Sequence, residues 1–365
     1  MNICIVATIC KETGALSIYN QLMSHLKEEQ QPDEHYYIFI DPSMPTPQLQ
    51  NVQYIKYATN GVKRAKFDFW DFKNLCEQNH IKPDVILSLN NSGVKYPDVK
   101  QFIYYHQSIP LYKYKIKSWD KASIRLRCYQ KFLPIYIKRS LSKDCSIIVQ
   151  TPIIKTLFSR KYKFPLEKIL VAFPDIKQPD TESIKEYSFD NKYFHFLYPA
   201  ARGIYKEHNT LVKAIKLIDD CEIRNKVRVH LTLSKGTKPS LEKDIRDAGL
   251  TEQFIFHGSI PHDVLLSMYK GSNGLLFPSM IETIGLPLLE AASFGIPIVA
   301  NNIDFVNEVL KGYTGLIKVP THDYKKWSNE ICNLCLNRQK YSEYKLARKS
   351  DWILVLNAIK SVDKL

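Results

Sequence analysis

Residues 277–299 read FPSMIETIGLPLLEAASFGIPIV and predict a strand, a loop, a helix and a second strand, in that order. Ahead of the loop, Gly274–Phe277 is a short apolar run typical of a buried strand. Gly295 and Pro297 end the helix before the next apolar run at 298–300. Two strands joined through a helix form the repeating unit of a parallel α/β sheet.

The helix inside this stretch starts at a Gly-Leu-Pro turn. Pro287 fits the first helical turn, because the N–H that proline lacks has no partner there. The free N–H groups near Ile284, Gly285 and Leu286 would then point together at an anion. A phosphate is the natural ligand for such a helix end.

Two carboxylates, Glu282 and Glu290, stand eight positions apart around this turn. Glu282 precedes the anion-binding end, whereas Glu290 lies one to two turns into the helix, at roughly 1.5 Å of rise per residue. One carboxylate could therefore reach a sugar while the other reaches the far side of a nucleotide. The alternative is that Glu282 caps the helix and Glu290 is a solvated surface residue.

The carboxylate pair, with its Pro-Ser, Gly-Leu-Pro and Ala-Ala-Ser-Phe-Gly-Ile-Pro surroundings, resembles the Glu-seven-residues-Glu signature of retaining glycosyltransferases with the GT-B fold. The resemblance is closest to family 4, the glycosyl transferases group 1. It implies an α/β protein with two Rossmann-like domains facing a cleft and a C-terminal helix that crosses back to the first domain. It also implies that Glu282 is catalytic and that Glu290 binds the ribose hydroxyls of the donor.

The rest of the chain alternates short apolar strands with longer amphipathic stretches, as parallel α/β sheets do. A polar stretch without clear periodicity separates two such series, and we expect it to be an interdomain linker. The expected domains are 1–174, binding the acceptor, and 193–345, binding the nucleotide sugar, with the linker at 175–192 and a C-terminal helix in 346–365. The expected strands are near 3–9, 36–40, 52–57, 85–89, 102–105, 146–149, 169–172, 194–198, 227–233, 254–256, 274–277, 298–300 and 316–318.

Arg202 and Lys206 follow the first strand of the second series. This segment resembles the family loop in which an Arg and a Lys hold the donor diphosphate. Fixed cations there stabilise the charge that builds on the leaving phosphate as the sugar bond breaks. The chain has Glu207 where the family commonly has glycine, and an ordinary surface pair is the alternative reading.

Further donor and catalytic candidates lie at strand ends. His106 resembles the family histidine that contacts the sugar near the reacting carbon, although a satisfied structural histidine would also fit. Gly14, between the first strand and its helix, would let backbone approach the phosphates. The other candidates are Gly258 and Ile260, in a loop that looks like the one flanking the base, and Ser279 and Thr283, which could donate to phosphate.

The composition is that of an ordinary globular protein, with 45% hydrophobic and 24% charged residues. No apolar run reaches the ~18 residues of a membrane span, and the first eight residues predict a strand rather than a signal peptide. We therefore expect a cytoplasmic protein. The eight cysteines are scattered, and the Cys332–Cys335 pair has no second pair to complete a zinc site, so reduced core thiols are expected. No Asp-X-Asp occurs, and we expect neither metal nor cofactor beyond the nucleotide-sugar donor.

The net charge of +14 calls for an acidic partner. Residues 113–143 hold ten basic side chains, opposed only by Asp120 and interleaved with aromatic and aliphatic residues. Such a segment suits an anionic membrane surface, where each basic residue contributes on the order of 1 kcal/mol. A solvated helix face without a partner is the alternative, and no nucleic-acid recognition motif accompanies the charge. We expect the protein to be peripheral on the cytoplasmic face of a membrane.

The resemblance implies a retaining glycosyltransferase that moves a sugar from a nucleotide-diphosphate donor to a hydroxyl of a glycan or lipid-linked acceptor, in bacterial surface polysaccharide synthesis. Two rival readings stay open. One is a GT-B enzyme that transfers no sugar to an acceptor, such as a nucleotide-sugar epimerase or a phosphorylase. The other is a basic binding protein without catalysis.

Overall fold

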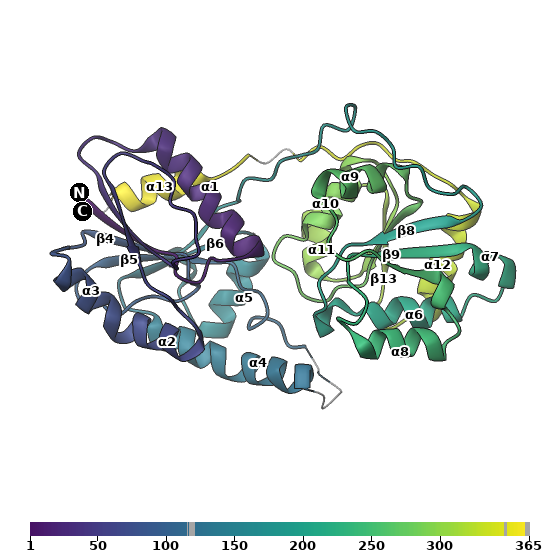
Figure 1. Ribbon diagram of the computed structural model, residues 1–365, viewed down its shortest axis with the longest axis horizontal. Helices are drawn as coiled ribbons and strands as arrows, with labels where there is room; N and C mark the ends of the chain where they lie inside the picture. Colours follow the sequence, from purple (N-terminus) through teal and green to yellow (C-terminus); the bar gives the residue numbers. More distant parts are fainter. Residues whose placement is uncertain (115, 117–120, 347–348, 362–365) are drawn as a thin grey trace. The chain divides into compact units, whose positions relative to one another are not determined.

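The computed structural model describes residues 1–114, 116, 121–346 and 349–361 (Figure 1). The chain divides into two compact units, and each is described here by itself. Unit 1 comprises Met1–Ile176 and Arg348–Leu365, and unit 2 comprises Lys177–Ala347. Each unit is built on its own parallel sheet, which confirms the predicted α/β class.

The sheet of unit 1 has seven strands in the order β3-β2-β1-β4-β5-β6-β7, all paired in parallel. Its strands are β1 (Asn2–Val6), β2 (His35–Ile40), β3 (Val52–Lys56), β4 (Val85–Ser88), β5 (Lys100–Tyr105), β6 (Cys145–Val149) and β7 (Ile169–Val171). Its helices are α1 (Thr13–Glu29), α2 (Gly61–Lys66), the π-helix η1 (Phe67–Asp71), α3 (Phe72–Gln78), α4 (Lys121–Ser140), α5 (Pro152–Tyr162), the 3-10 helix η2 (Leu166–Lys168) and α13 (Trp352–Lys360).

The apolar strands of unit 1 bury both faces of the sheet. In β1, Ile3 and Ile5 belong to a core with α1 and α13, whereas Cys4 and Val6 belong to a core with η1 and α3. Successive strand residues point to opposite faces, so a continuous apolar run is what a sheet covered on both sides requires. The cores therefore explain why these strands were recognisable in the sequence.

The C-terminal helix α13 packs beside α1 in unit 1, as Figure 1 shows. Trp352 is fully buried; its ring stacks on Tyr104 with centroids 5.2 Å apart, and its Nε1 donates to Oε1 of Gln21 at 3.0 Å. Asp351 accepts the N–H of Phe173 at 2.8 Å. The predicted return of the chain's end to the first domain is thus confirmed.

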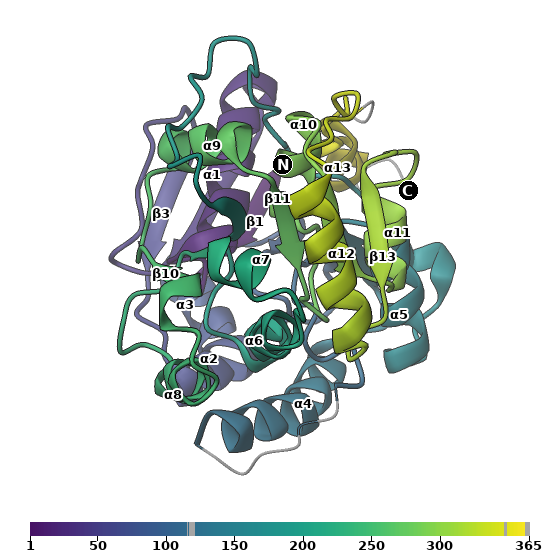
Figure 2. The same cartoon turned by 90° about the vertical axis from the view of Figure 1, so that its right-hand side faces the viewer.

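The sheet of unit 2 has six parallel strands in the order β10-β9-β8-β11-β12-β13. Figure 2 shows α6 and α12 side by side in this unit. The strands are β8 (Phe194–Tyr198), β9 (Val227–Leu231), β10 (Phe254–Phe256), β11 (Gly274–Phe277), β12 (Ile298–Asn301) and β13 (Leu316–Val319). The helices are the 3-10 helices η3 (Ile204–Lys206) and η4 (Thr251–Gln253), and α6 (His208–Lys216), α7 (Cys221–Lys226), α8 (Pro239–Asp247), α9 (His262–Gly271), α10 (Leu286–Ser293), α11 (Asp304–Val309) and α12 (Tyr324–Leu336).

The segment expected as a linker, 175–192, is mostly part of unit 2. The boundary between the units falls between Ile176 and Lys177. Beyond it, the N–H of Tyr187 donates to the Ser267 carbonyl at 3.1 Å, and the Lys270 ammonium donates to two carbonyls of the segment at 2.7 Å each. Backbone groups supply these contacts, so a polar composition without periodicity did not reveal them.

No helix among the described residues is long and apolar enough to cross a membrane. The pair Cys332 and Cys335 lies in α12, and all cysteines are free. Cys335 is buried as expected, but Cys128 and Cys221 are exposed, so they are not core thiols.

Candidate functional site

The candidate site forms at the carboxyl ends of β8 and β11, neighbouring strands in the middle of the unit 2 sheet. From β8 the chain continues outward to β9 and β10, and from β11 it continues outward on the other side to β12 and β13. The loops after β8 and β11 therefore diverge at the point where the strand order reverses. In open α/β sheets, ligands bind at such a switch point.

Lys206 and Glu282 form an ion pair across this switch point, in which the ammonium donates directly to Oε1 of the carboxylate. The side chain of Lys206 is 13% exposed to solvent and that of Glu282 is 16% exposed. The structure therefore brings together the predicted phosphate cation and the predicted sugar carboxylate.

Backbone bonds fix the two loops that carry this pair. The N–H of Met280 donates to the Tyr205 carbonyl at 2.8 Å, which ties the loop after β11 to η3. The fully buried Tyr198 donates its hydroxyl to the Lys206 carbonyl, which ties η3 back to β8. Burial, with the nearby carboxylates of Glu282 and Glu207, raises the pKa of Tyr198 well above its usual value, so this hydroxyl stays a donor.

Helix α10 starts at the predicted turn. Gly285 is the N-cap residue with φ of 69°, and Pro287 lies in the first turn. A Cβ on Gly285 would come within 3.1 Å of Leu288 and 3.2 Å of Phe305, and its left-handed backbone favours glycine in any case. No side chain caps this helix end and no acidic residue lies in its first turn. Pro287 has no N–H and Leu288 donates to the Gly285 carbonyl at 2.8 Å, so the helix dipole and the N–H groups that precede Pro287 are what this end offers an anion.

Glu290 lies one turn into α10 and accepts a hydrogen bond from Nε2 of His262 at 2.9 Å. His262 opens α9 directly after the loop that follows β10, so this contact links that loop to α10. The Glu290 side chain is 16% exposed, and it lies near the buried Tyr269 hydroxyl, whose pKa burial and the Glu290 charge raise well above its usual value. Glu290 is therefore held by neighbours and is not a freely solvated surface residue.

The remaining unit 2 candidates differ in how they are placed. Arg202 is exposed and makes no hydrogen bond or ion pair with any described residue. Ser279 is fully buried and donates to the Ile281 carbonyl at 3.4 Å, so its hydroxyl supports the loop from inside. Gly258 is buried with φ of 75° in the loop after β10. Ile260 and Thr283 are both half-buried, in the loops after β10 and β11 respectively.

His106 and Gly14 belong to unit 1. His106 follows β5, and its backbone N–H donates to Oδ1 of Asn91 at 2.7 Å while its ring Nε2 lies 3.1 Å from the Leu89 carbonyl. Burial lowers the pKa of His106 to about 4, so the imidazole is neutral near pH 7. Gly14 lies in the first turn of α1, where a Cβ would meet no protein atom within 4 Å, so no contact within the protein requires glycine there and the predicted approach to phosphate stays a prediction.

Sequence reasoning missed two residues at this edge of the sheet, Lys238 and His208, and the charges of Lys206 and Lys238 both act on His208. Lys238, in the loop after β9, donates to Nδ1 of His208 at 3.0 Å, and His208 is the first residue of α6. The available signal was their position, since both follow central strands of the predicted sheet. Neither belongs to a motif, and for that reason they were overlooked.

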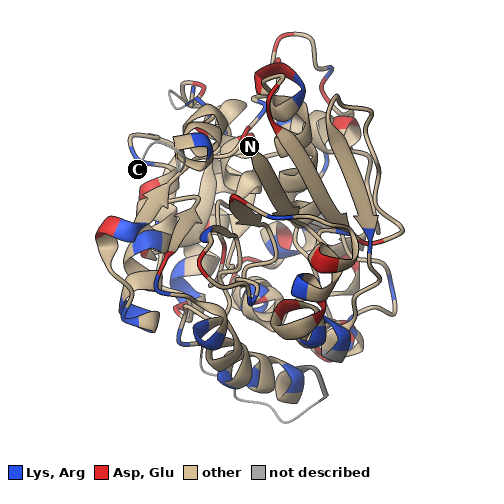
Figure 3. Ribbon diagram, turned by 90° about the vertical axis from the view of Figure 1, so that its left-hand side faces the viewer, with Lys and Arg blue, Asp and Glu red and all other residues tan. Residues whose placement is uncertain are grey.

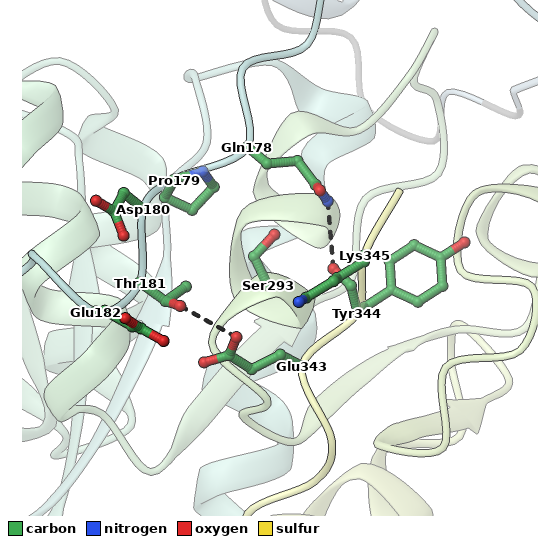
Figure 4. Close-up of a pocket in the computed structure, with 9 residues that line it drawn as sticks. All are labelled: Gln178, Pro179, Asp180, Thr181, Glu182, Ser293, Glu343, Tyr344 and Lys345. Carbon is green, nitrogen blue, oxygen red and sulfur yellow. Dashed lines mark hydrogen bonds between the residues drawn. The ribbon is translucent and has the colours of Figure 1, made fainter. Parts of the chain in front are cut away.

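A pocket of about 230 Å³ lies where the chain enters and leaves unit 2 (Figure 4). Thr181 donates to Oε2 of Glu343 at 3.1 Å across it. No predicted site residue lines this pocket, so it is separate from the Lys206 and Glu282 site. Its walls come from Gln178, Pro179, Asp180, Thr181, Glu182, Ser293, Glu343, Tyr344 and Lys345.

Comparison with known proteins places this geometry in context. Residues 179–350, which include the site in unit 2, match the family model of the glycosyl transferases group 1. The O-antigen chain mannosyltransferase RfbU of Salmonella typhimurium is 23% identical over 292 residues, which cover 79% of this chain and 72% of that protein.

Solved structures match over the full length. The apo form of the lipopolysaccharide outer core galactosyltransferase WaaB gives a TM-score of 0.62 at 16% identity, over 99% of this chain and 95% of that one. HepE from Anabaena in complex with UDP-glucose gives a TM-score of 0.64 at 12% identity, over 100% of both chains. At these identities the likeness establishes the fold, and the predicted GT-B fold is confirmed.

Proposed function

We propose that this chain, whose residues 179–350 match the family model of the glycosyl transferases group 1, is a retaining hexosyltransferase that uses a nucleotide-diphosphate sugar. The observation that carries the proposal is the Lys206–Glu282 ion pair next to the uncapped start of α10. A cation, a carboxylate and a helix N-terminus meet there at the switch point of the sheet. This combination suits a ligand that joins a phosphate to a sugar.

The proposed chemistry follows from where charge develops. A bond forms between an acceptor hydroxyl oxygen and the anomeric carbon, and the bond from that carbon to the phosphate oxygen breaks. Attack from the leaving-group side retains the configuration, and the departing phosphate takes the hydroxyl proton. Lys206, Arg202 and the N–H groups at 284–286 would stabilise the charge on the leaving phosphate, and this stabilisation grows in the transition state.

The carboxylates have separate proposed roles. Glu282 would exchange part of its bond with Lys206 for contacts to the donor sugar, close to the reacting carbon. Glu290 would accept hydrogen bonds from the ribose, with His262 orienting the carboxylate. The neutral imidazole of His106 would supply a sugar contact from unit 1. No step in this scheme draws on a metal.

The proposed biological setting is bacterial surface polysaccharide synthesis. The matched relatives are named as an O-antigen chain mannosyltransferase and a lipopolysaccharide outer core galactosyltransferase. Both names describe enzymes that add a sugar to a glycan of the cell surface. We propose a glycan or lipid-linked acceptor of that class for this chain as well.

Thermal stabilisation by a panel of UDP, GDP, ADP and CMP, and by their sugars, tests the donor site. One nucleotide class is expected to raise the melting temperature, because a ligand that binds only the folded state stabilises it. Lys206→Ala and Glu290→Ala should each weaken that shift. Lys213→Ala, on the exposed side of α6 and bonded to Tyr324, is the matched control and should leave it unchanged.

The same panel separates the rivals. Absence of a shift with every nucleotide would contradict the transferase proposal and favour the basic binding protein. A nucleotide-sugar epimerase would bind the same ligands, but it would interconvert the free nucleotide sugar without any acceptor. Product analysis by NMR distinguishes these outcomes.

We also propose that unit 1 docks on an anionic membrane surface through α4. Figure 3 shows basic positions along this helix. Ile124, Phe132 and Ile135 are 46%, 57% and 48% exposed, and they recur at helical spacing. They are flanked by the exposed basic residues Arg125, Lys131, Lys138 and Arg139. Of the basic segment 113–143, residues 115 and 117–120 lie outside the described part of the chain.

Vesicle sedimentation tests the docking proposal. The protein should bind phosphatidylglycerol vesicles more strongly than neutral ones, and raised salt should weaken the binding, because salt screens surface charge. The double variant Phe132→Ser, Ile135→Ser should lose most of it. Leu166→Ser, at an equally exposed apolar residue of η2, is the control. Binding that ignores salt and the double substitution would contradict the proposal.

A further inference from the structure

Lys238, at the carboxyl edge of the unit 2 sheet, forms no ion pair with any residue that the structure describes. It ends the loop after β9 and precedes α8. Within the described part of the chain, its ammonium makes one hydrogen bond, to a neutral acceptor, Nδ1 of His208. No carboxylate of the described residues comes within ion-pairing distance of its ammonium. The nearest acidic groups, Glu207 on the α6 side and Asp244 on α8, have other partners: His322 lies 3.7 Å from Glu207, and Asn209 donates to Asp244.

Its surroundings make this charge costly. Lys238 is half-buried, and burial lowers its pKa to about 8, although Glu207 and Asp244 act in the opposite direction. A charged group taken out of water destabilises the protein unless a partner compensates. No described residue supplies an anion that would offset this cost. An anionic ligand bound to this ammonium would therefore stabilise the folded protein.

His208 holds the ammonium in place. Its side chain is fully buried, and burial with the neighbouring charges of Lys238 and Lys206 pushes its pKa well below the usual value, so the imidazole is neutral. Because Lys238 can only donate, Nδ1 of His208 is the acceptor and the ring proton lies on Nε2. The other N–H groups of the Lys238 ammonium make no hydrogen bond with the described residues, so they can donate to a ligand.

The same imidazole connects Lys238 to the candidate site. His208 follows Lys206 by two residues and begins α6, whose nine residues direct their N-terminal end at this corner. Lys206 already has a carboxylate partner in Glu282, whereas Lys238 is ion-paired with none of the described carboxylates. This corner of the sheet therefore holds two lysines: Lys206 forms an ion pair, and Lys238 forms none with the described residues.

We propose that Lys238 is a further anion-binding residue, held by His208, that takes a diphosphate together with Lys206. The inference rests on the proposed function in one respect, namely that the diphosphate is the one carried by the nucleotide-sugar donor. The alternative source is free pyrophosphate or phosphate, which presents the same oxygens. A purely structural lysine would have the same contacts but no ligand.

Calorimetric titration tests the proposal with the nucleoside diphosphate that stabilises the wild type, the matching nucleoside, and pyrophosphate as separate ligands. Lys238→Gln keeps an N–H for His208 but removes the charge. Its diphosphate affinity should fall roughly 10- to 100-fold, the range for one charge-assisted hydrogen bond, while nucleoside binding stays unchanged. Lys238→Arg should keep most of the affinity. Lys235→Ala, an exposed lysine of the same loop, is the matched control and should bind like the wild type.

Proton uptake on ligand binding distinguishes a ligand-binding Lys238 from a purely structural one. A structural lysine would not change its protonation when the diphosphate binds. An anion beside Lys238 raises its pKa, so binding at pH 8 to 9 should take up a fraction of a proton, and Lys238→Gln should abolish this uptake. Titrations in buffers of different ionisation enthalpy measure it. Equal diphosphate affinity and equal proton uptake in the wild type and Lys238→Gln would overturn the inference while leaving the proposed function intact.

The pyrophosphate titration separates the two failures. If the wild type binds no nucleoside diphosphate but binds pyrophosphate in a Lys238-dependent way, the proposed function fails and the anion site stands. If the wild type binds neither ligand, both are overturned.

Discussion

At the scale of single residues, the site in unit 2 is organised by charge. Lys206 and Glu282 neutralise each other in a largely buried position, because only about a seventh of each side chain is exposed to solvent. Partly buried pairs of this kind contribute modestly to stability, but leaving one partner alone is costly. A ligand that carries both a phosphate and sugar hydroxyls can replace the pair without stranding either charge. The ion pair is therefore a preformed arrangement that a donor can enter.

A second arrangement at this scale is a ladder of three histidines across β8, β9 and the end of β10. Nδ1 of His195 lies 2.9 Å from Nε2 of His230, and Nδ1 of His230 lies 2.8 Å from Nε2 of His257. Nε2 of His195 lies 2.9 Å from the Asp190 carbonyl, which can only accept. The ladder therefore runs in one direction, with each Nε2 donating and all three rings neutral.

The ladder predicts a loss of stability in acid. Burial lowers the pKa of His230 to about 3, and it also lowers the pKa values of His195 and His257. The unfolded chain binds these protons near pH 6.5, so the ladder's contribution to stability is fully present above pH 6.5 and decreases as pH falls below it. For the buried His230 the loss continues toward pH 3, by up to about 1.4 kcal/mol per pH unit. Amide hydrogen exchange in β8, β9 and β10, followed as a function of pH, measures this loss of stability.

His230→Gln should flatten this dependence on pH, even though the variant is less stable at pH 7. His35→Gln removes an exposed histidine of β2 and serves as the control. An unchanged slope between pH 6.5 and 3 in His230→Gln would show that the ladder does not supply the acid sensitivity.

At the scale of elements, the start of α10 depends on the backbone of Gly285. Gly285 and Gly249 share nearly the same left-handed backbone, with φ of 69° and 68°. A Cβ on Gly249 would meet nothing within 4 Å, whereas one on Gly285 would press on Leu288 and Phe305. Gly249 therefore isolates the backbone strain from the packing at Gly285.

Gly249→Ala should cost about 1–2 kcal/mol, the strain of a left-handed residue with a Cβ. Gly285→Ala should cost more, because neighbouring side chains must also shift, and it should weaken nucleotide binding by moving the N–H groups at the start of α10. Chemical denaturation and calorimetry give the two readouts. Equal losses of stability with unchanged nucleotide affinity would count against a role of this turn in binding.

Helix α13 provides the test of how the chain's end is held. Trp352→Ala should destabilise unit 1 by roughly 3–5 kcal/mol, because removal of a fully buried indole leaves a large cavity and removes the hydrogen bond to Gln21. Ile353→Ala, at a half-exposed neighbour, should change stability by about 0.5 kcal/mol or less. Hydrogen exchange in α1 and α13 compares them, and equal protection in both variants would refute the packing argument.

The strands could be predicted because a parallel sheet covered on both faces needs continuous apolar runs such as Ile3–Val6, and their ends differ from expectation by only a few residues. Loop contacts could not be predicted, because they depend on tertiary geometry. Ser279 shows this, because it lies in the motif that was predicted to bind phosphate, yet the motif did not reveal that its side chain is fully buried. Lys238 shows the converse, since no motif marks it and only the fold brings it beside His208.

At the scale of the whole molecule, two units divide the candidate residues. Unit 2 carries the donor candidates, from Arg202 to Glu290, and unit 1 carries His106, Gly14 and the basic helix α4. The net charge of +14 is partly concentrated in the segment that contains α4. On the proposed function, one unit binds the anionic donor and the other brings the chain to the surface where a lipid-linked acceptor would be found.

Sugar transfer tests the central claim most directly. The purified protein is incubated with the labelled nucleotide sugar that stabilises it and with a bacterial membrane fraction as the source of acceptor. The label incorporated into glycan is then compared between the wild type, Lys206→Ala and the control Lys213→Ala, and NMR gives the configuration of the new linkage. The account predicts a retained configuration in the wild type, a loss of roughly 100- to 1,000-fold in Lys206→Ala and little change in Lys213→Ala. Incorporation that is equal in all three proteins, or a new linkage of inverted configuration, would contradict it.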